Sequence, residues 1–258
     1  MKYSYHNHTH LCQHAFGTPE EYVREAIKAD FEFFGFSCHA PHHFSDGYLS
    51  PIRMRWEQLP EYVDTVLSLK HKYRDSINIG LGLEYELYRP TLDKDIAYYR
   101  SQGIEYLILG QHFTDDETLP SSFNSYHETD SREGLSAYTD TIIEAMETGL
   151  ISYVAHPDCF FFSGDEDFYL AEADRLILAA IKYGVPLEAN VFGHSRNRHY
   201  PKESFWRRAA ALGAACVMGI DAHTPERVYI EEEVLRTRAF LEELGITPLD
   251  KINLRKIR

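Results

Sequence analysis

The sequence reads EYLILGQH over residues 105–112, a short apolar run followed by glycine, glutamine and histidine. A run of this length and composition predicts a buried β-strand near Glu105–Leu109. Stretches of helical period lie on both sides, so the strand is predicted to be one member of a series of alternating strands and helices. The histidine, His112, therefore falls just beyond the carboxyl end of a strand.

Six further runs of the same kind are found along the chain. They lie near Lys2 to His8, Glu32 to Cys38, Ile77 to Leu83, Ile151 to Ala155, Val185 to Ala189 and Ala214 to Gly219. A segment of helical period follows each run, and this alternation predicts βαβ units and a mainly parallel sheet. Because the chain has 258 residues and no linker or low-complexity tract, we expect one α/β domain over residues 1–258.

Local signals support individual helices and loops. A threonine N-cap, a proline at the first helical position and a glutamate three residues after the cap coincide at Thr18-Pro19-Glu20-Glu21. The segment from Trp56 to Tyr73 places its apolar residues on roughly one face, as an amphipathic helix does. Residues 114–133 and 159–167 are expected to be long loops, which in barrels build the functional face after the strands.

Composition restricts the kind of partner and compartment. Acidic residues outnumber basic ones 40 to 26, which gives a net charge of -14 and argues against a nucleic-acid or membrane-surface binder. A small partner is expected, and bound cations could still attract an anion to an acidic protein. The four cysteines show no CxxC spacing, and no signal peptide or long apolar run is found, so a reducing cytoplasm is the expected location. The cysteines are interpreted as small buried residues.

Six of the seven predicted strands end in side chains that bind metal ions in proteins. These residues are His6 and His8, His39, Glu84, His112, His156, and Asp221 with His223. The carboxyl ends of parallel strands converge on one face, so we expect these side chains to meet in one pocket. His14, on the loop just beyond the first strand, joins the set. Imidazoles together with carboxylates suit Zn, Mn or Fe.

Each of these residues also has an ordinary structural interpretation. A single histidine at a strand end is usually hydrogen-bonded or partly exposed, and Asp221 could be a helix N-cap near Pro225. The ions could also only stabilise the fold, which would make the chain a non-catalytic metal-binding module. We favour a catalytic site because structural zinc sites are closed by four ligands per ion, whereas this set leaves positions open. The remaining histidines that we do not expect to be ligands include His71, His127, His194 and His199.

Taken together, the strand-end motifs resemble those of the PHP (polymerase and histidinol phosphatase) superfamily, and within it the histidinol-phosphatase branch. The matching motifs are His6-Asn7-His8-Thr9-His10-Leu11-Cys12-Gln13-His14, Cys38-His39-Ala40-Pro41, Gly82-Leu83-Glu84, Gly110-Gln111-His112-Phe113, Ala155-His156-Pro157-Asp158 and Gly219-Ile220-Asp221-Ala222-His223. The resemblance spans nearly the whole chain and fills nine ligand positions in order. It implies a distorted (β/α)7 barrel, in agreement with the seven alternations.

The resemblance also implies how two or three divalent ions share the ligands. One ion is expected at His6, His8, Glu84 and Asp221. Glu84 would bridge this ion to a second one, held by His112 and His156. A third ion is expected at His14, His39 and His223, and some relatives hold only two.

Such ions predict a phosphoesterase. Two cations that share a water lower its pKa and give a nucleophile near neutral pH, and they also neutralise the phosphoryl oxygens. The leaving oxygen then needs an acid, for which Asp221, His223 and His42 are candidates. The resemblance implies a phosphomonoesterase acting on a small phosphorylated metabolite, with L-histidinol phosphate as the first candidate. A nuclease or phosphodiesterase, or a phosphotyrosine phosphatase, would be an alternative with the same chemistry.

The chain departs from the family pattern at the substrate. Histidinol phosphatases carry a phosphate-contacting arginine shortly after the fifth-strand histidine and another just after the sixth-strand Glu-x-Asn, but this chain has phenylalanines at 160–162 and 192. Arginine binds phosphate oxygens with a planar fork that phenylalanine lacks. Arg196 and Arg198, slightly downstream, are the expected replacements. Arg53 and Arg55 are a second choice, and His42 is a further candidate contact. The phenylalanines could stack on an aromatic leaving group.

Overall fold

The computed structural model describes residues 1–44 and 47–257. Within these residues one sheet has seven parallel strands, which follow one another in the order of the chain. They are β1 (Tyr3–Ser4), β2 (Phe33–His39), β3 (Asn78–Tyr85), β4 (Tyr106–Leu109), β5 (Ile151–Val154), β6 (Leu187–Asn190) and β7 (Cys216–Gly219). Each strand lies within its predicted run or extends past it by one or two residues, so the predicted order of elements is confirmed.

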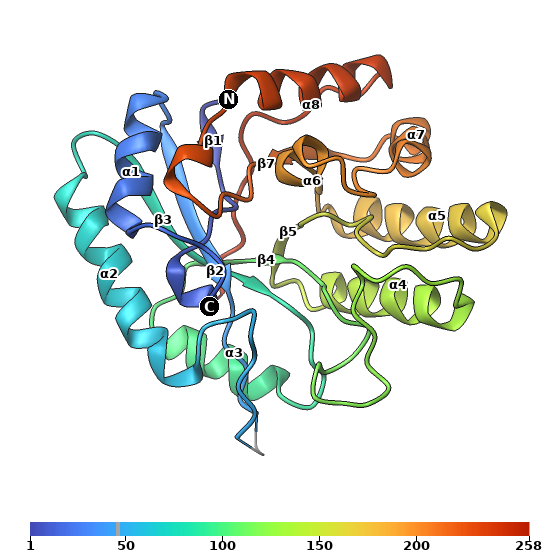
Figure 1. The fold of residues 1–258 in the computed structure, drawn as a ribbon, viewed down its shortest axis with the longest axis horizontal. Coiled ribbons are helices and arrows are strands. Elements are labelled where there is room, and N and C mark those ends of the chain that lie inside the picture. Colours follow the sequence, from blue (N-terminus) through green and yellow to red (C-terminus); the bar gives the residue numbers. More distant parts are fainter. Residues whose placement is uncertain (45–46, 258) are drawn as a thin grey trace.

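Helices follow every strand and surround the sheet, with α1 and α2 on one side and α4 and α5 on the opposite side (Figure 1). The α-helices are α1 (Pro19–Lys28), α2 (Leu59–Lys72), α3 (Leu92–Ser101), α4 (Arg132–Glu147), α5 (Glu166–Tyr183), α6 (Val191–Ser195), α7 (Glu203–Leu212) and α8 (Glu231–Glu243), and the short 3-10 helices are η1 (His10–Cys12), η2 (Trp56–Gln58) and η3 (Pro225–Arg227). The predicted capping box begins α1. The Thr18 hydroxyl accepts from the Glu21 amide, and the Glu21 carboxylate accepts from the Thr18 amide at 2.6 Å.

The sheet closes into a nearly complete barrel where its first and last strands meet. Asn7 and Ala222 form a parallel bridge just beyond β1 and β7. On either side of it the His8 amide donates to the Ala222 carbonyl at 3.0 Å, and the Asp221 amide donates to the His6 carbonyl at 2.9 Å. β1 is shorter than predicted, but the Asn7 carbonyl still accepts from the Ser37 amide of β2 at 2.9 Å, so the residues after Ser4 lie between β2 and the end of β7. The distorted (β/α)7 barrel is confirmed.

Aromatic side chains fill the barrel towards the amino ends of its strands. The Tyr106 hydroxyl, in β4, lies 3.1 Å from the Tyr5 carbonyl oxygen and 3.2 Å from the Phe36 carbonyl oxygen, so it can donate its proton to either. Gly82 on β3 makes room for this ring, because a Cβ at Gly82 would lie 2.3 Å from the Tyr106 Cζ. The C-terminal segment covers this end, where the Ile252 amide donates to the Tyr5 hydroxyl at 3.1 Å. A filled interior leaves room for a ligand at the carboxyl ends of the strands.

The two predicted long loops lie beside each other at that carboxyl end. Thr129, in the loop before α4, forms a parallel bridge with Phe162, in the loop before α5. Ser125 connects the same two loops, because its carbonyl accepts from the Phe161 amide at 2.8 Å. Both loops therefore carry their own hydrogen bonds and form a defined wall near the strand ends.

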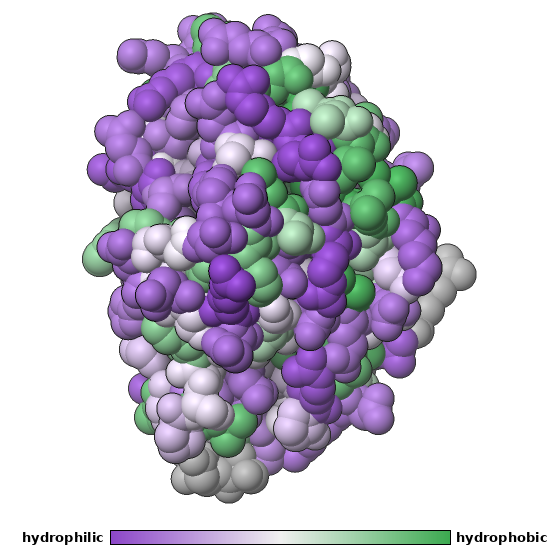
Figure 2. All heavy atoms as spheres, turned by 90° about the vertical axis from the view of Figure 1, so that its right-hand side faces the viewer, coloured by the Kyte–Doolittle hydropathy of each residue, from purple (hydrophilic) through white to green (hydrophobic). Residues whose placement is uncertain are grey.

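One face of the molecule shows mainly polar side chains with scattered apolar ones. Polar side chains predominate on the face at the right of Figure 1, as the space-filling view shows (Figure 2). None of the helices in residues 1–44 and 47–257 combines the length and apolar character that crossing a membrane requires.

Candidate metal centre

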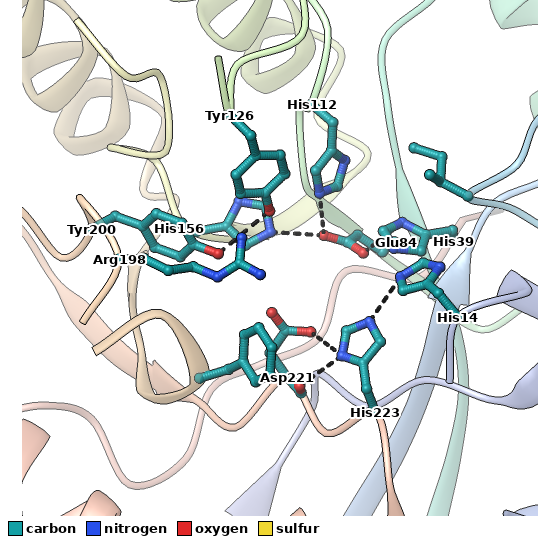
Figure 3. Close-up of a pocket in the computed structure, with 12 residues that line it drawn as sticks. His14, His39, Glu84, His112, Tyr126, His156, Arg198, Tyr200, Asp221 and His223 are labelled. Carbon is teal, nitrogen blue, oxygen red and sulfur yellow. Dashed lines mark hydrogen bonds and ion pairs between the residues drawn. The ribbon is translucent and has the colours of Figure 1, made fainter. Parts of the chain in front are cut away.

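The nine side chains expected to bind metal lie together at the carboxyl end of the barrel. Of these, seven described residues line a cavity of about 420 Å³, as the close-up shows (Figure 3). His6 and His8 are fully buried beside them. The complete set is His6, His8, His14, His39, Glu84, His112, His156, Asp221 and His223. They come from β2, β3 and the segments after β1, β4, β5 and β7, so the structure brings distant parts of the chain to one site.

The carboxylate of Glu84, in β3, lies at the centre of the cluster. Imidazole nitrogens surround it, from His39 at 2.9 Å, His156 at 3.0 Å, His6 at 3.4 Å, His8 at 3.5 Å and His112 at 3.7 Å. The two carboxylate oxygens face different imidazoles, since Oε2 faces His8 and His39 whereas Oε1 faces the other three. A carboxylate with ligands on both oxygens has the geometry to bridge two cations.

Asp221 forms a second carboxylate centre, just after β7. Its Oδ1 lies 2.9 Å from the His8 Nε2 and 3.4 Å from the His6 Nε2. The Asp221 backbone has a φ of 58°, and His156 has a φ of 31°. Non-glycine residues with positive φ carry a strain of about 1–3 kcal/mol and persist where the surroundings demand them, often at functional sites. The strained backbone turns both side chains into the cluster.

Several polar atoms of this cluster are buried and have no hydrogen-bond partner among the described residues. They are Nε2 of His6, both ring nitrogens of His8, Nδ1 of His39, Nδ1 of His156, Oε2 of Glu84 and Oδ1 of Asp221. A buried polar atom without a partner costs about 1–3 kcal/mol, so the cluster is unfavourable unless something binds it. Divalent cations would satisfy these atoms, and their imidazole and carboxylate chemistry fits such ions.

The spacing of these atoms defines candidate positions for the ions. Several groups of three described residues offer one ligand atom per residue with all three atoms within 4.8 Å, among them His6–His8–Asp221, His6–Glu84–His156 and His8–His39–His223. The first contains three of the four residues expected for the first ion, whereas the second has His6 in the place expected for His112. The third has His8 in the place expected for His14, whose Nε2 lies 3.0 Å from the His223 Nε2. A further group of this kind joins His8 with the buried thiols of Cys12 and Cys38.

Charge compensation shifts the pKa values of the cluster in opposite directions. Burial alone would lower the pKa of His8, but the Asp221 carboxylate 2.9 Å from its Nε2 raises it to about 9. Burial, together with the charge on His8, lowers the pKa of His223 to about 3. Burial alone would raise the pKa of Glu84, yet His39 and the other imidazoles hold it well below its usual range. The cation-free cluster therefore holds protons that a cation would displace.

Two further carboxylates orient imidazoles from behind. The Nδ1 of His6 lies 2.9 Å from Glu188, and the Nδ1 of His112 lies 3.1 Å from Glu86. Each carboxylate accepts the Nδ1 proton and leaves Nε2 facing Glu84, an arrangement that fixes the tautomer of a metal-binding histidine. The sequence analysis assigned neither residue to the site. The signals were a Glu-x-Asn at the end of the sixth strand, Glu188 with Asn190, and a Glu-x-Glu that places Glu86 two residues after Glu84.

Two glycines leave room for the carboxylates. A Cβ at Gly110, just after β4, would lie 1.8 Å from the Glu84 Oε1. A Cβ at Gly219, in β7, would lie 2.0 Å from the Glu188 Oε2. Both positions therefore require glycine for close approach, and Glu84 and Glu188 occupy the volume that any other side chain would take.

The structure separates the expected substrate contacts. Arg198 lines the cavity, and its guanidinium lies 5.3 Å from the Tyr126 ring and 5.2 Å from the Phe192 ring. Arg196 is exposed, as Arg198 is, and its guanidinium lies 5.7 Å from the Phe192 ring, but it does not line the cavity. His42 does not line it either, because its Nδ1 is held 2.7 Å from the buried Asp95. Position thus supports only Arg198 of the three expected contacts.

The second-choice arginines and the phenylalanines also lie elsewhere. Arg53 is fully buried and pairs with Glu86 and Glu117, so it does not offer its guanidinium to a phosphate. Arg55 is the N-cap of η2 and does not line the cavity. Residues 160–162 do not line it either, whereas Phe192 does, together with Tyr126 and Tyr200. The sequence analysis missed these two tyrosines because they lie in loops without a recognisable motif.

Comparison with known proteins places this site in context. The model of the PHP domain family matches residues 4–191, which leaves Asp221 and His223 beyond the matched span. The probable histidinol-phosphatase of Deinococcus radiodurans is 29% identical over 230 residues, covering 86% of either chain. The one of Schizosaccharomyces pombe is 26% identical over 275 residues, covering 96% of this chain and 89% of the other.

A solved structure has a similar fold over almost the full length. It is the histidinol phosphate phosphatase of Lactococcus lactis in complex with Zn, L-histidinol and phosphate, which superposes with a TM-score of 0.74 at 18% identity and covers 98% of each chain.

Proposed function

The chain belongs to the PHP domain family and is a phosphatase, and from this premise we propose that it hydrolyses small phosphomonoesters, with L-histidinol phosphate as the first candidate. The observation that carries the proposal is the cluster around Glu84 and Asp221, which faces a cavity of small-molecule size. Named histidinol phosphatases among the relatives support the substrate, and the Lactococcus lactis structure holds Zn, L-histidinol and phosphate.

We assign the resident ions to the ligand sets in the order expected from the family. The first set is His6, His8, Glu84 and Asp221, the second is Glu84, His112 and His156, and the third is His14, His39 and His223. Divalent cations bound there supply charge neutralisation for a phosphoryl group and a coordinated water of lowered pKa. Zn, Mn and Fe all accept such ligands.

Protein side chains of the cavity bind and orient the substrate. Arg198 offers the planar donor fork that phosphate oxygens prefer, and it lines the cavity on the side of Tyr200 and His156 (Figure 3). Burial raises the pKa of Tyr126 and of Tyr200, so both phenols stay protonated and can donate hydrogen bonds. Phe192 supplies an apolar wall against which an aromatic leaving group such as an imidazole can stack.

The three candidate acids differ in what they can contribute. Asp221 has a pKa held well below its usual range by His6 and other imidazoles despite burial, and His223 has a pKa of about 3, so both are unprotonated at neutral pH. His42 lies outside the cavity lining. Asp221 and His223 thus act as ligands in this proposal. A leaving oxygen takes its proton from solvent or from a neutral donor of the cavity wall.

Substrate profiling tests the proposal. Phosphate release is measured with added Mn or Zn for L-histidinol phosphate, phosphotyrosine, p-nitrophenyl phosphate and a dinucleotide. We expect the highest kcat/KM with L-histidinol phosphate and loss of turnover in Asp221→Asn. A preference for the dinucleotide would instead indicate a phosphodiesterase, and no turnover in any metal would indicate a binding module.

A matched pair of variants tests the substrate contact. Arg198→Gln is expected to raise KM for the phosphomonoester by about 10-fold or more, because a charge-assisted hydrogen bond contributes about 1.5–3 kcal/mol. Arg196→Gln removes an exposed arginine from the same loop and is expected to leave KM unchanged. Equal effects of the two substitutions would contradict a specific role for Arg198.

A further inference from the structure

A buried arginine lies behind the ligand cluster without lining its cavity. The side chain of Arg53 is 1% exposed, and all of its contacts are with protein groups. Its Nη2 donates to Glu86 at 2.7 Å and to the Tyr88 hydroxyl at 3.1 Å, and its Nε donates to Glu117 at 2.6 Å. One cation thus serves two buried carboxylates, which would otherwise be costly to bury.

Glu86 transmits this interaction to a metal ligand. Its Oε1, which accepts from Arg53, also accepts from the His112 Nδ1 at 3.1 Å. Its Oε2 accepts from the backbone amides of His112 at 2.9 Å and Phe113 at 3.1 Å. Four donors therefore converge on one carboxylate. The His112 Nδ1 donates its proton to this hydrogen bond, and the Nε2 lone pair is left facing Glu84.

The segment around Arg53 also holds two other loops that carry ligands. The Arg53 Nη1 donates to the carbonyl of Ala40, next to the ligand His39, at 3.3 Å. The Gln13 side chain, next to the ligand His14, donates to the Arg53 carbonyl at 2.8 Å and to the Ser50 carbonyl at 2.7 Å. Loops after β1, β2 and β4 are thus tied to one another through this segment.

We propose that Arg53 is a positioning residue for the metal centre, which acts through Glu86 to hold the His112 ring with Nε2 towards Glu84. The proposal rests on the proposed function in assigning His112 as a ligand, but its evidence is the hydrogen-bond network itself. Arg53 neutralises Glu86, and Glu86 in turn fixes the orientation and tautomer of the imidazole. Neither residue touches the substrate.

The amide isostere Glu86→Gln separates this role from general stability. In one orientation the NH₂ group of the new amide faces the His112 Nδ1 and Arg53, and in the other it faces the two backbone amides. All of these groups are donors, so the NH₂ group meets another donor in either orientation. The His112 ring is then expected to change tautomer or move. Glu117→Gln is the matched control, because it removes the other negative charge paired with Arg53, and the Glu117 carboxylate accepts from Ser50 and Arg53 rather than from His112.

The measurement is a titration of the full-length protein with Co²⁺, followed by its visible absorption and by metal content after dialysis, without substrate. Glu86→Gln is expected to weaken one class of Co²⁺ site by about 10- to 100-fold, the size usual for lost orienting partners. Glu117→Gln should bind Co²⁺ like the wild type. Arg53→Gln should weaken the same class as Glu86→Gln, and Arg53→Lys should restore part of the loss because it keeps the charge.

Three results would overturn the proposal. The first is an Arg53→Gln protein that binds Co²⁺ as tightly as the wild type, and the second is the same result for Glu86→Gln. The third is an equal weakening by Glu117→Gln. Because Co²⁺ binding is read without turnover, a wild-type protein that fails to hydrolyse phosphomonoesters would contradict the proposed function and leave this test intact.

Discussion

Substitution of Gly110 by alanine adds one carbon at the most crowded point of the site. The new Cβ would lie 1.8 Å from the Glu84 Oε1 and 2.5 Å from its Cδ. The backbone cannot easily withdraw, because the Gly110 amide donates to the Tyr85 carbonyl at 3.0 Å. Ordinary contact begins near 3.4 Å, so the carboxylate must move by about 1.6 Å.

This displacement is large compared with what a metal site tolerates. Coordination distances vary by only about 0.2 Å, so a carboxylate displaced by about 1.6 Å cannot keep two ions bridged. Misplacement of about 1 Å costs roughly 100-fold in rate, so we expect kcat/KM of Gly110→Ala to fall by at least about 100-fold. Metal content per chain should fall with it.

The assay compares phosphate release and metal content after dialysis for the wild type, Gly110→Ala and Gly134→Ala. Gly134 lies in the first turn of α4, where an added Cβ would meet its nearest neighbour, the Phe160 ring, at 3.2 Å. Alanine is favoured over glycine in helices by about 1 kcal/mol, so this control should stay active. A Gly110→Ala protein with wild-type metal content and turnover would refute the bridging role of Glu84.

Three more expectations follow from the same cluster. Glu188→Gln should weaken metal binding by about 10- to 100-fold in a chelator competition, because the His6 Nδ1 loses the carboxylate at 2.9 Å; unchanged affinity would contradict this orienting role. Apparent metal affinity should rise with pH up to about 9, because the pKa of His8 is raised to about 9 and the His8 proton must leave before a cation binds. Calorimetry in buffers of different ionisation enthalpy should detect the released protons. Removal of metal by a chelator should lower the melting temperature, since a ligand at 1,000 times its Kd stabilises the folded state by about 4 kcal/mol. Identical melting temperatures with and without metal would count against tight binding.

Much of the barrel could be predicted because its determinants are local. The runs that became β2 to β7 are short and apolar with helical segments between them, and that pattern does not depend on distant residues. The end of β1 was less predictable, because Asn7 pairs with Ala222 more than 200 positions away. Ligand convergence followed from topology alone, since the carboxyl ends of parallel strands must face one way.

The substrate wall could not be predicted in the same way. Arg196 and Arg198 are two residues apart, and only the backbone path after α6 decides that Arg198 faces the cavity. His42 follows a ligand motif, but the buried Asp95 holds its ring elsewhere. Sequence also cannot show that Arg53 is buried between two carboxylates, because Glu86 and Glu117 lie 33 and 64 positions from it.

The seam between β1 and β7 would give bound metal ions a mechanical role. His6 and His8 stand on one side of it and Asp221 on the other, so a cation held by all three is a cross-link between the two ends of the fold. In chain-entropy terms a cross-link around a loop of about 210 residues restricts the unfolded chain by roughly 5 kcal/mol. The ions that would serve catalysis would thus also hold the last strand of the barrel, β7, to the first strand, β1.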